Sequence, residues 1–224
     1  MAIMRHLYLF LFVLLSTFCS AQGRKESIDG IDVSHHQGKI NWTKVHDQYP
    51  KLMFVYVKAT EGKTYTDPRC EENVKNARSV GYKVGVYHFF RMTSGAREQF
   101  ANFNKMIAKV GIDLVPMVDV ETSDKHSTKE LKDSLMVFIN LIKEMHGVEP
   151  MIYGTNRSYN TYCAPDFNHL PMYIGRYGTE RPVVKGPSHY SIWQYSENGI
   201  INGIPKPVDL CRLHKDFKIE SIYF

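Results

Sequence analysis

The sequence contains little cysteine, no repeated segment and none of the common short catalytic motifs. Only 4 of its 224 residues are cysteines, and none belongs to a Cys-x-x-Cys or Cys-x-x-His group, so neither a disulfide framework nor structural zinc is indicated. The absence of a fixed period or low-complexity stretch argues against solenoids and linkers. No Gly-x-Ser-x-Gly, phosphate-binding glycine loop or His-Glu-x-x-His occurs, which weakens serine hydrolase, nucleotide-binding and zinc protease interpretations.

The composition is that of an ordinary globular domain. The chain is 43% hydrophobic, 12% aromatic and 23% charged, which is enough apolar material for one large core. The formal net charge of +5 is mild and is spread along the chain rather than gathered in one basic stretch. We therefore expect one domain and no nucleic-acid partner.

The first 21 residues have the features of a secretory signal peptide. A basic start precedes an apolar run of 12 residues, Leu7 to Phe18, which ends at Cys19-Ser20-Ala21. A bilayer-spanning helix needs about 20 residues, so we expect cleavage before Gln22, no membrane anchor after cleavage, and a secreted or periplasmic product. A lipoprotein signal ending at Cys19 is the alternative, and the bulky Phe18 argues against it.

Residues 22–224 then form the single expected domain. Short apolar runs alternate with helical patterns there, which is typical of βα units wound into a parallel sheet. Several runs are apolar on both faces, which is typical of parallel strands that are covered on both sides. Eight strands are predicted, at residues 28–34, 53–58, 83–89, 114–120, 151–153, 172–176, 191–195 and 208–211.

Helical periodicity is clearest between the earlier strands. Helices are predicted at about 68–80, 96–107 and 127–145, the last with a capping box of Ser127 and Glu130 and a stop at Gly147. Its expected buried face carries Leu131, Leu135, Phe138, Ile142 and Met145. Beyond Tyr153 the connections between strands are predicted to be loops. We therefore predict an α/β fold, an irregular eight-stranded (β/α) TIM-like barrel with helices mainly in its first half.

Acidic residues stand at the ends of predicted strands, where a parallel barrel carries its functional groups. Asp119 and Glu121 are two residues apart on one strand, so they share a face with Cα atoms about 6.6 Å apart. Two such carboxylates, one with a raised pKa, are the machinery of glycosidic bond cleavage. Asp32 and Asp209 lie on the first and last predicted strands. An Asp-x-Glu pair alone is also compatible with two acids that are simply solvated at a strand end or that cap the following helix.

Aromatic residues accompany these acids. Sugar rings present flat C–H faces that stack on aromatic rings, so a rim of acids and aromatics suits a polysaccharide, although each ring alone is more typical of core filling. The adjacent His35 and His36 point to opposite faces of a strand, which favours a hydrogen-bonding role over a metal site. The rim aromatics are Tyr87, Phe89, Tyr153, Tyr177, Trp193 and Tyr195.

Six blocks of this sequence together resemble the glycoside hydrolase family 25 lysozymes, the N-acetylmuramidases that cut peptidoglycan. The resemblance covers nearly all of residues 22–224, and the blocks follow the family's order. They are Gly30-Ile31-Asp32-Val33-Ser34-His35 with Gln37-Gly38, Val57-Lys58-Ala59-Thr60-Glu61-Gly62, Gly85-Val86-Tyr87-His88-Phe89-Phe90, Asp119-Val120-Glu121, Trp193-Gln194-Tyr195-Ser196 with Gly199, and Val208-Asp209-Leu210.

The resemblance implies hydrolysis of the β-1,4 bond between N-acetylmuramic acid and N-acetylglucosamine. It makes Glu121 the general acid, and Asp119 the residue that orients the substrate's own 2-acetamido group, whose oxygen attacks the anomeric carbon with net retention. Asp32 and Asp209 would tune pKa values and hold sugar or water.

The resemblance implies no metal or organic cofactor and makes bacterial peptidoglycan the partner. We also expect a monomer in solution, and we expect five of the rim aromatics to bind sugar. Two positions depart from the family pattern, Cys211 and His36, and both lie beside the expected site. The sugar-binding aromatics are Tyr87, Phe89, Tyr153, Trp193 and Tyr195.

Two other functions are compatible with parts of this pattern. A chitinase-like hydrolase would use a similar carboxylate pair and the same acetamido assistance, but Asp32 and the block around Trp193 argue against it. A catalytically silent carbohydrate-binding barrel would not need both Asp119 and Glu121. The three remaining cysteines, Cys70, Cys163 and Cys211, allow at most one disulfide, and buried thiols are favoured.

Overall fold

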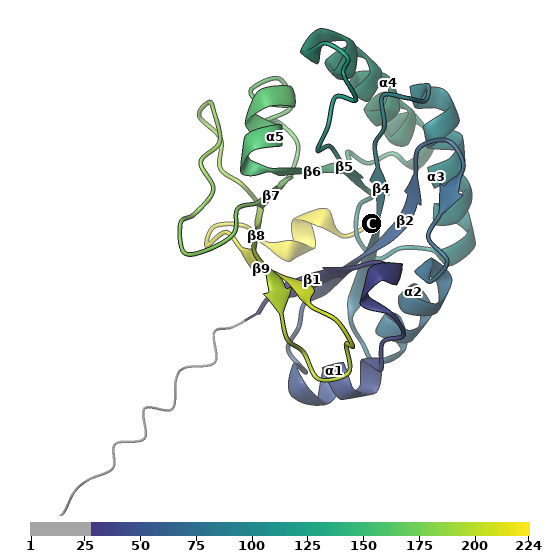
Figure 1. Ribbon diagram of the computed structural model, residues 1–224, viewed down its shortest axis with the longest axis vertical. Coiled ribbons are helices and arrows are strands. Elements are labelled where there is room, and N and C mark those ends of the chain that lie inside the picture. Colours follow the sequence, from purple (N-terminus) through teal and green to yellow (C-terminus); the bar gives the residue numbers. More distant parts are fainter. Residues whose placement is uncertain (1–27) are drawn as a thin grey trace, which may run out of the picture.

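The computed structural model describes residues 28–224, so the expected signal peptide lies outside the described residues. Eight strands close into a barrel, in which β1 pairs with both β2 and β9 (Figure 1). This confirms the predicted α/β barrel. The strands are β1 (Gly30–Val33), β2 (Phe54–Glu61), β4 (Lys83–Phe89), β5 (Met117–Asp119), β6 (Met151–Thr155), β7 (Met172–Gly175), β8 (Ile192–Gly199) and β9 (Val208–Leu213).

The last strand corrects the expectation of an all-parallel barrel. Pairs from β1 through β8 are parallel, but β9 is antiparallel to both β8 and β1. A strand that reverses direction brings its start to the rim where its neighbours end. Asp209, the second residue of β9, therefore pairs with Asp32 near the end of β1. The remaining short strand, β3 (Tyr65–Thr66), folds back on the end of β2.

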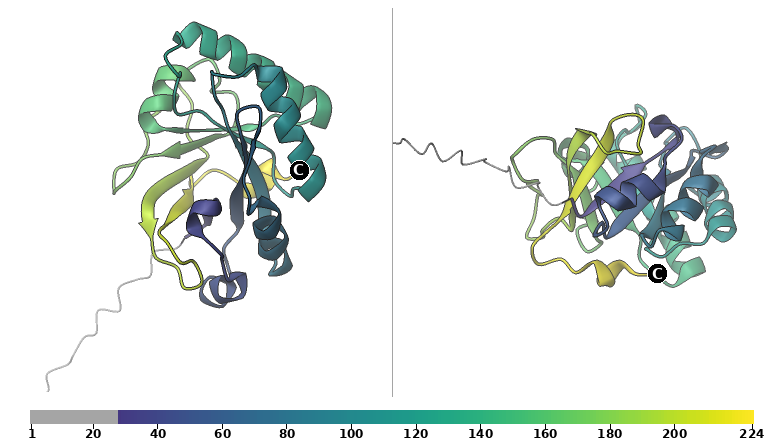
Figure 2. Two further views of the ribbon diagram at one scale, coloured as in Figure 1. Left: turned by 45° about the vertical axis from the view of Figure 1, so that its right-hand side comes forward. Right: turned by 90° about the horizontal axis from the view of Figure 1, so that it is seen from below.

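Helices wrap one side of the barrel more than the other. The long helices α2, α3 and α4 lie outside β2, β4 and β5, whereas residues 176–191 connect β7 to β8 as a loop (Figures 1 and 2). This distribution confirms that the helices are concentrated in the first half. The helices are α1 (Trp42–Gln48), α2 (Cys70–Ser79), α3 (Ala96–Val110), α4 (Thr128–His146) and α5 (Asn156–Tyr162), with 3-10 turns η1 (His35–Gln37) and η2 (Ile219–Ile222).

Local signals explain where these helices begin and end. Ser127 and Glu130 form the predicted capping box of α4, and Gly147 ends it in the left-handed conformation with φ 71°. The predicted position of Met145 on the buried face is wrong, since Met145 is 60% exposed and Ile142 is the last buried residue of α4. Helix α5 lies where a loop was predicted. Its seven residues are too few to show a period, although Thr155 accepts a cap hydrogen bond at its start.

Two apolar clusters hold the barrel. The outer one packs the helices against the strands, and the inner one fills the lower barrel with large rings such as Phe54, Tyr56 and Tyr173. Gly85 makes room for this filling, since a Cβ there would stand 2.4 Å from the Tyr56 ring. Turn η2 lies at the end opposite η1 and contributes Ile219 to the inner cluster (Figure 2). The packed bottom leaves the other rim for polar groups.

Two further features of residues 28–224 are the state of their cysteines and the hydropathy of their helices. The three cysteines in this range are buried free thiols, and no disulfide joins them, as the sequence favoured. Within the same range no helix combines the length and the apolar character needed to cross a membrane.

Candidate active site

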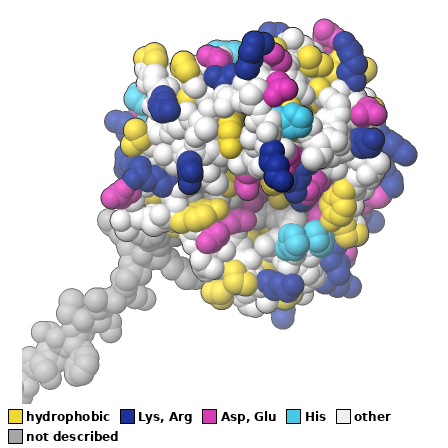
Figure 3. Space-filling model, turned by 45° about the horizontal axis from the view of Figure 1, so that its top comes forward, with side chains coloured by type: hydrophobic (Ala, Val, Ile, Leu, Met, Phe, Trp, Pro, Cys, Tyr) yellow, Lys and Arg dark blue, Asp and Glu magenta, His cyan; other side chains and the backbone are white. Residues whose placement is uncertain are grey.

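A cavity of about 350 Å³ opens at the rim where the parallel strands end. Figure 3 shows acidic side chains, in magenta, lying close together on the corresponding face of the molecule. One lysine, Lys58, is the single Lys or Arg side chain among the described residues that line the cavity. The acidic residues in the lining are Asp32, Asp119, Glu121, Glu197 and Asp209.

Asp32 is the most completely hydrogen-bonded of these acids. Its Oδ2 accepts from the Tyr173 hydroxyl at 2.6 Å and from Gln194 Nε2 at 2.9 Å, and the Cys211 thiol lies 3.7 Å away. Burial raises the pKa of Asp32, and these donors oppose that rise by favouring its charged form. Burial and the nearby Asp32 charge raise the pKa of Asp209 to about 9. The two facing carboxyls therefore favour sharing a proton over both being ionised.

Asp119 differs because it is buried without a partner. It ends β5 with 6% of its surface exposed, and its buried Oδ1 has no hydrogen-bond partner among the described residues. Burial, followed by the charge of Glu121, raises the pKa of Asp119 well above the ordinary value. A buried carboxylate oxygen without a donor is costly, so this position is prepared to accept a hydrogen bond from a bound molecule.

Glu121 stands two residues further on, at the more exposed mouth of the cavity. Burial, followed by the charge of Asp32, raises its pKa, while Lys58 opposes the rise. The sequence parity is confirmed here: Met117 and Asp119 face the barrel interior, whereas Val118 packs into the outer cluster. The two acids thus share one cavity, and burial raises the pKa of both.

The structure brings only some of the predicted aromatics to the cavity. Tyr87, Phe89 and Tyr153 line it, but Trp193 and Tyr195 do not. Side chains alternate along β8, and Gln194, between them, is the one that points inward. Trp193 joins the outer cluster and donates from Nε1 to the Arg176 carbonyl at 2.7 Å, while the Arg212 guanidinium lies 4.3 Å from the Tyr195 ring centroid.

Several lining residues were absent from the predicted site. Gln194 joins the aromatic wall to Asp32, because its Oε1 accepts from the Tyr153 hydroxyl at 2.8 Å and the Tyr177 hydroxyl at 3.2 Å. Strand parity could have found Gln194, since it faces opposite to Trp193. The others are Ser34, His36, Lys58, Met117 and Glu197.

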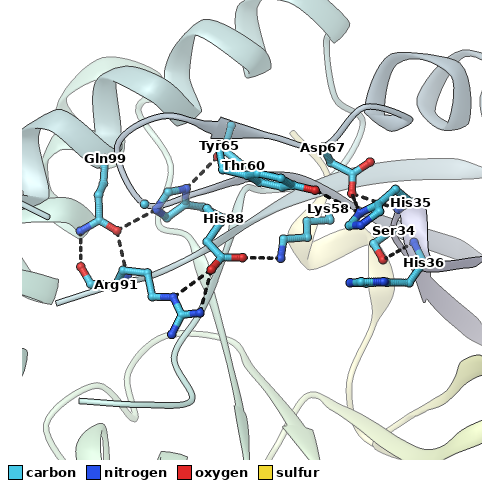
Figure 4. Close-up of polar contacts among 12 residues, drawn as sticks. Ser34, His35, His36, Lys58, Thr60, Tyr65, Asp67, His88, Arg91 and Gln99 are labelled. Carbon is cyan, nitrogen blue, oxygen red and sulfur yellow. Dashed lines mark hydrogen bonds and ion pairs between the residues drawn. The ribbon is translucent and has the colours of Figure 1, made fainter. Parts of the chain in front are cut away.

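The two adjacent histidines lie at the cavity edge. His35 Nδ1 lies 2.7 Å from the buried Asp67 Oδ2, and the rings of His35 and His36 stand 4.0 Å apart. Figure 4 shows His35 turned toward Asp67 and His36 turned away from it. Among residues 28–224 no three His, Cys, Asp or Glu side chains are grouped closely enough to hold a metal ion.

Comparison with known proteins places this arrangement in a family. Residues 31–204 match the sequence profile of Glycosyl hydrolases family 25. The chain belongs to this family. The predicted family and the predicted glycoside hydrolase class are thereby confirmed.

Relatives of this family 25 chain include both unassigned proteins and lysozymes. It is 33% identical over 186 residues to the uncharacterized protein YegX of Escherichia coli K12, covering 82% of this chain and 68% of YegX. It is 30% identical over 197 residues to Lysozyme M1 of Streptomyces globisporus, covering 81% and 66%. A solved family 25 glycosyl hydrolase from Bacillus anthracis superposes with a TM-score of 0.77 at 27% identity, covering 85% of this chain and 90% of that one.

Proposed function

We propose that this family 25 protein is a lysozyme that hydrolyses the β-1,4 bond between N-acetylmuramic acid and N-acetylglucosamine in bacterial peptidoglycan. The relationship to Lysozyme M1 supports the substrate class. The observation that carries the chemistry is the buried Oδ1 of Asp119, which has no hydrogen-bond partner among residues 28–224 and lies near Glu121, whose pKa is raised by burial. Such a pair offers one acceptor for a substrate amide and one proton donor for a leaving oxygen.

The proposed first step uses the acetamido group of the substrate. Its N–H donates to Asp119 Oδ1, which favours the charged form of Asp119, and that charge in turn helps Glu121 to keep its proton. The acetamido oxygen then attacks the anomeric carbon, the glycosidic bond breaks, and Glu121 gives its proton to the leaving oxygen. Water afterwards opens the cyclic intermediate, with Glu121 as base, so that the configuration is retained.

Asp32, Asp209 and the aromatic wall would hold the sugar for this step. Asp32 keeps a fixed orientation through Tyr173 and Gln194, and Asp209 opposite, whose pKa is raised, can donate to a sugar oxygen when it holds the shared proton. Tyr87 and Phe89 line the other side of the cavity, where a sugar ring can stack. No cofactor has a part in this scheme.

The decisive experiment compares wild-type protein with Glu121→Gln on purified peptidoglycan and on chitin. New reducing ends are identified by mass, and Glu144→Gln, an exposed acid on α4, is the matched control. We expect muramic acid ends from wild type and Glu144→Gln, and a loss of about 100-fold or more with Glu121→Gln, since general acid catalysis contributes at least that much. Glucosamine ends, new free amino groups, or full activity of folded Glu121→Gln would refute the proposal.

The stereochemistry needs its own measurement. Proton NMR of the first products, before mutarotation, should show the β-anomer at the new reducing end. An initial α-anomer would refute acetamido assistance while leaving the muramidase activity intact.

The sequence features of the N-terminus support a further part of this proposal. We infer that residues 1–21 direct secretion and are removed before Gln22, which leaves residues 22–224 as a monomeric catalytic domain outside the cytoplasm. Mass spectrometry of the mature protein from the native host should find Gln22 as the first residue. A mature chain that begins with a lipid-modified Cys19 would favour the lipoprotein alternative.

A further inference from the structure

A chain of alternating charges runs along one edge of the cavity and ends in the loop after Glu121. Lys58 Nζ lies 2.7 Å from one oxygen of Glu61, and the other oxygen pairs with Arg91 Nη2 at 2.8 Å. Arg91 Nη1 then reaches Asp124 at 3.2 Å. Figure 4 shows Lys58 and Arg91 on opposite sides of a shared carboxylate. The four side chains thus link β2, the end of β4 and the segment that follows β5.

Arg91 is the most firmly held member of this chain. Gln99, fully buried on α3, accepts from the Arg91 backbone N–H at 2.9 Å and donates to the Arg91 carbonyl at 2.7 Å (Figure 4). The guanidinium also lies 4.7 Å from the centroid of the Phe89 ring. Because backbone and side chain are both fixed, the Arg91 fork is a rigid reference point for its two acidic partners.

The loop after Glu121 is held by Arg91 through Asp124. Asp124 and Lys125 have φ of 47° and 72°, in the left-handed region that non-glycine residues rarely adopt. The Asp124 carboxylate accepts from Arg91 and from the Met92 backbone N–H at 2.9 Å. These contacts hold a strained segment that begins directly after Glu121.

At the other end of this series of charges, Glu61 fixes the position of the Lys58 ammonium. Lys58 is the single Lys or Arg among the described lining residues, and it shares the cavity with Asp119 and Glu121. Its ammonium is held instead by Glu61, outside the lining, and over the Phe89 ring at 5.0 Å. If Lys58 paired directly with Glu121, the attraction would keep Glu121 ionised and unable to give a proton.

We propose that Arg91 is a positioning residue that, through Glu61 and Asp124, holds both the Lys58 ammonium and the Glu121 loop in place. This inference rests on the proposed role of Glu121 as the acid. Arg91 does not line the cavity, so it acts only through its partners. Its forked geometry is essential, because a single ammonium cannot reach two separate carboxylates in the same way.

The test uses Arg91→Gln, Arg91→Lys and a matched control, Arg78→Gln. Arg78 pairs with Asp113 at 3.0 Å and has a side-chain exposure of 37%, against 35% for Arg91, but it lies on α2 outside the cavity lining. Turnover and KM are measured against pH on soluble glycan fragments of peptidoglycan. Thermal unfolding confirms that each variant is folded.

We expect Arg91→Gln to lower kcat about 10- to 100-fold with little change in KM, since a small misplacement of a reacting group costs that much. The charged groups around Glu121 include Asp32, Asp119, Asp209, Lys58 and Arg91. Release of the Lys58 ammonium toward Glu121 would lower the pKa of Glu121, so Arg91→Gln should move the basic limb of the pH profile downward, against the upward shift that loss of the Arg91 charge alone would give. Arg91→Lys should keep the limb in place and recover part of kcat. Arg78→Gln should behave as wild type.

Two results would overturn the inference. One is Arg91→Gln with wild-type kcat and pH profile. The other is a loss of activity that follows only a loss of stability, with an unmoved pH limb and no recovery in Arg91→Lys. NMR titration of the Glu121 carboxyl in both proteins separates this from the proposed function, because it requires no turnover. An inactive wild type would refute the lysozyme proposal, while an equal Glu121 pKa in the two proteins would refute the role of Arg91.

Discussion

The two pairs of acids in the cavity differ in how the fold satisfies them. Asp32 receives donors from Tyr173 and Gln194 and faces Asp209 across the β1–β9 pairing. Asp119 has a buried oxygen with no partner among residues 28–224. The first pair is complete within the protein, whereas the second lacks a hydrogen bond that a substrate amide can supply.

This difference separates a supporting role from a reacting one. A satisfied buried carboxylate contributes to a fixed geometry, and loss of its donors should reduce both stability and activity. An unsatisfied one costs stability and is useful only when a ligand is bound. A variant of Asp119 should therefore lose activity but not stability, whereas a variant that removes a donor to Asp32 should lose mainly stability.

Asp119→Asn should give the largest difference between the loss of activity and the loss of stability. Because the amide carries no charge to orient the acetamido group, we expect kcat to fall about 100- to 1000-fold, the range for loss of one electrostatic contact to the reacting group. Stability should not fall, since the substitution breaks no hydrogen bond to Oδ1 among residues 28–224. Activity assays and urea unfolding measure the two effects. A marked loss of stability would show that Asp119 is partnered in the folded protein.

Tyr173→Phe should do the reverse. The variant removes the 2.6 Å donor to Asp32 and leaves the ring packed in the inner cluster. We expect a loss of about 1.5–3 kcal/mol in the free energy of unfolding, as for a hydrogen bond to a charged group. The fall in kcat should be smaller than for Asp119→Asn. Unchanged stability in urea unfolding would mean that the Asp32 pair is not structurally important.

The satisfied pair also predicts a pH dependence. Burial, followed by the charge of Asp32, raises the pKa of Asp209 from 3.8 to about 9. A folded-state pKa above the unfolded value means that the folded state binds more protons, so stability falls as pH rises between about 4 and 9. Asp209→Asn should flatten this slope when unfolding is followed across that range. Parallel slopes in the two proteins would contradict the raised pKa.

Local patterns predicted the acid pair at the end of β5 better than the pair shared by β1 and β9. Asp119 and Glu121 follow from the parity of one strand, which is visible in the sequence. The pairing of Asp209 with Asp32 depends on the direction of β9, which no local pattern encodes. The contacts of Arg91 likewise join segments about 30 residues apart, with separations of 30 and 33 along the chain. Such contacts are set by the closure of the barrel.

The same reasoning explains the aromatic residues. Tyr87 and Phe89 lie on β4, whose full length was predicted, and both face the cavity. Trp193 and Tyr195 were assigned to the rim because they stand at a predicted strand end, without use of parity, and β8 turns both away from the cavity. A position at a strand end therefore gives the strand's location but not the face that meets the sugar.

The smallest expected effect tests this assignment of faces. Tyr177 lines the cavity and is 46% exposed, whereas Tyr195 lies on the outer face beside Arg212. Tyr177→Ala should raise KM about 2- to 10-fold, since an aromatic contact is worth about 0.5–1.5 kcal/mol. Tyr195→Ala is the control and should leave KM unchanged. Equal increases in both variants would mean that the substrate extends over the outer face of β8, beyond the cavity that the four acids define.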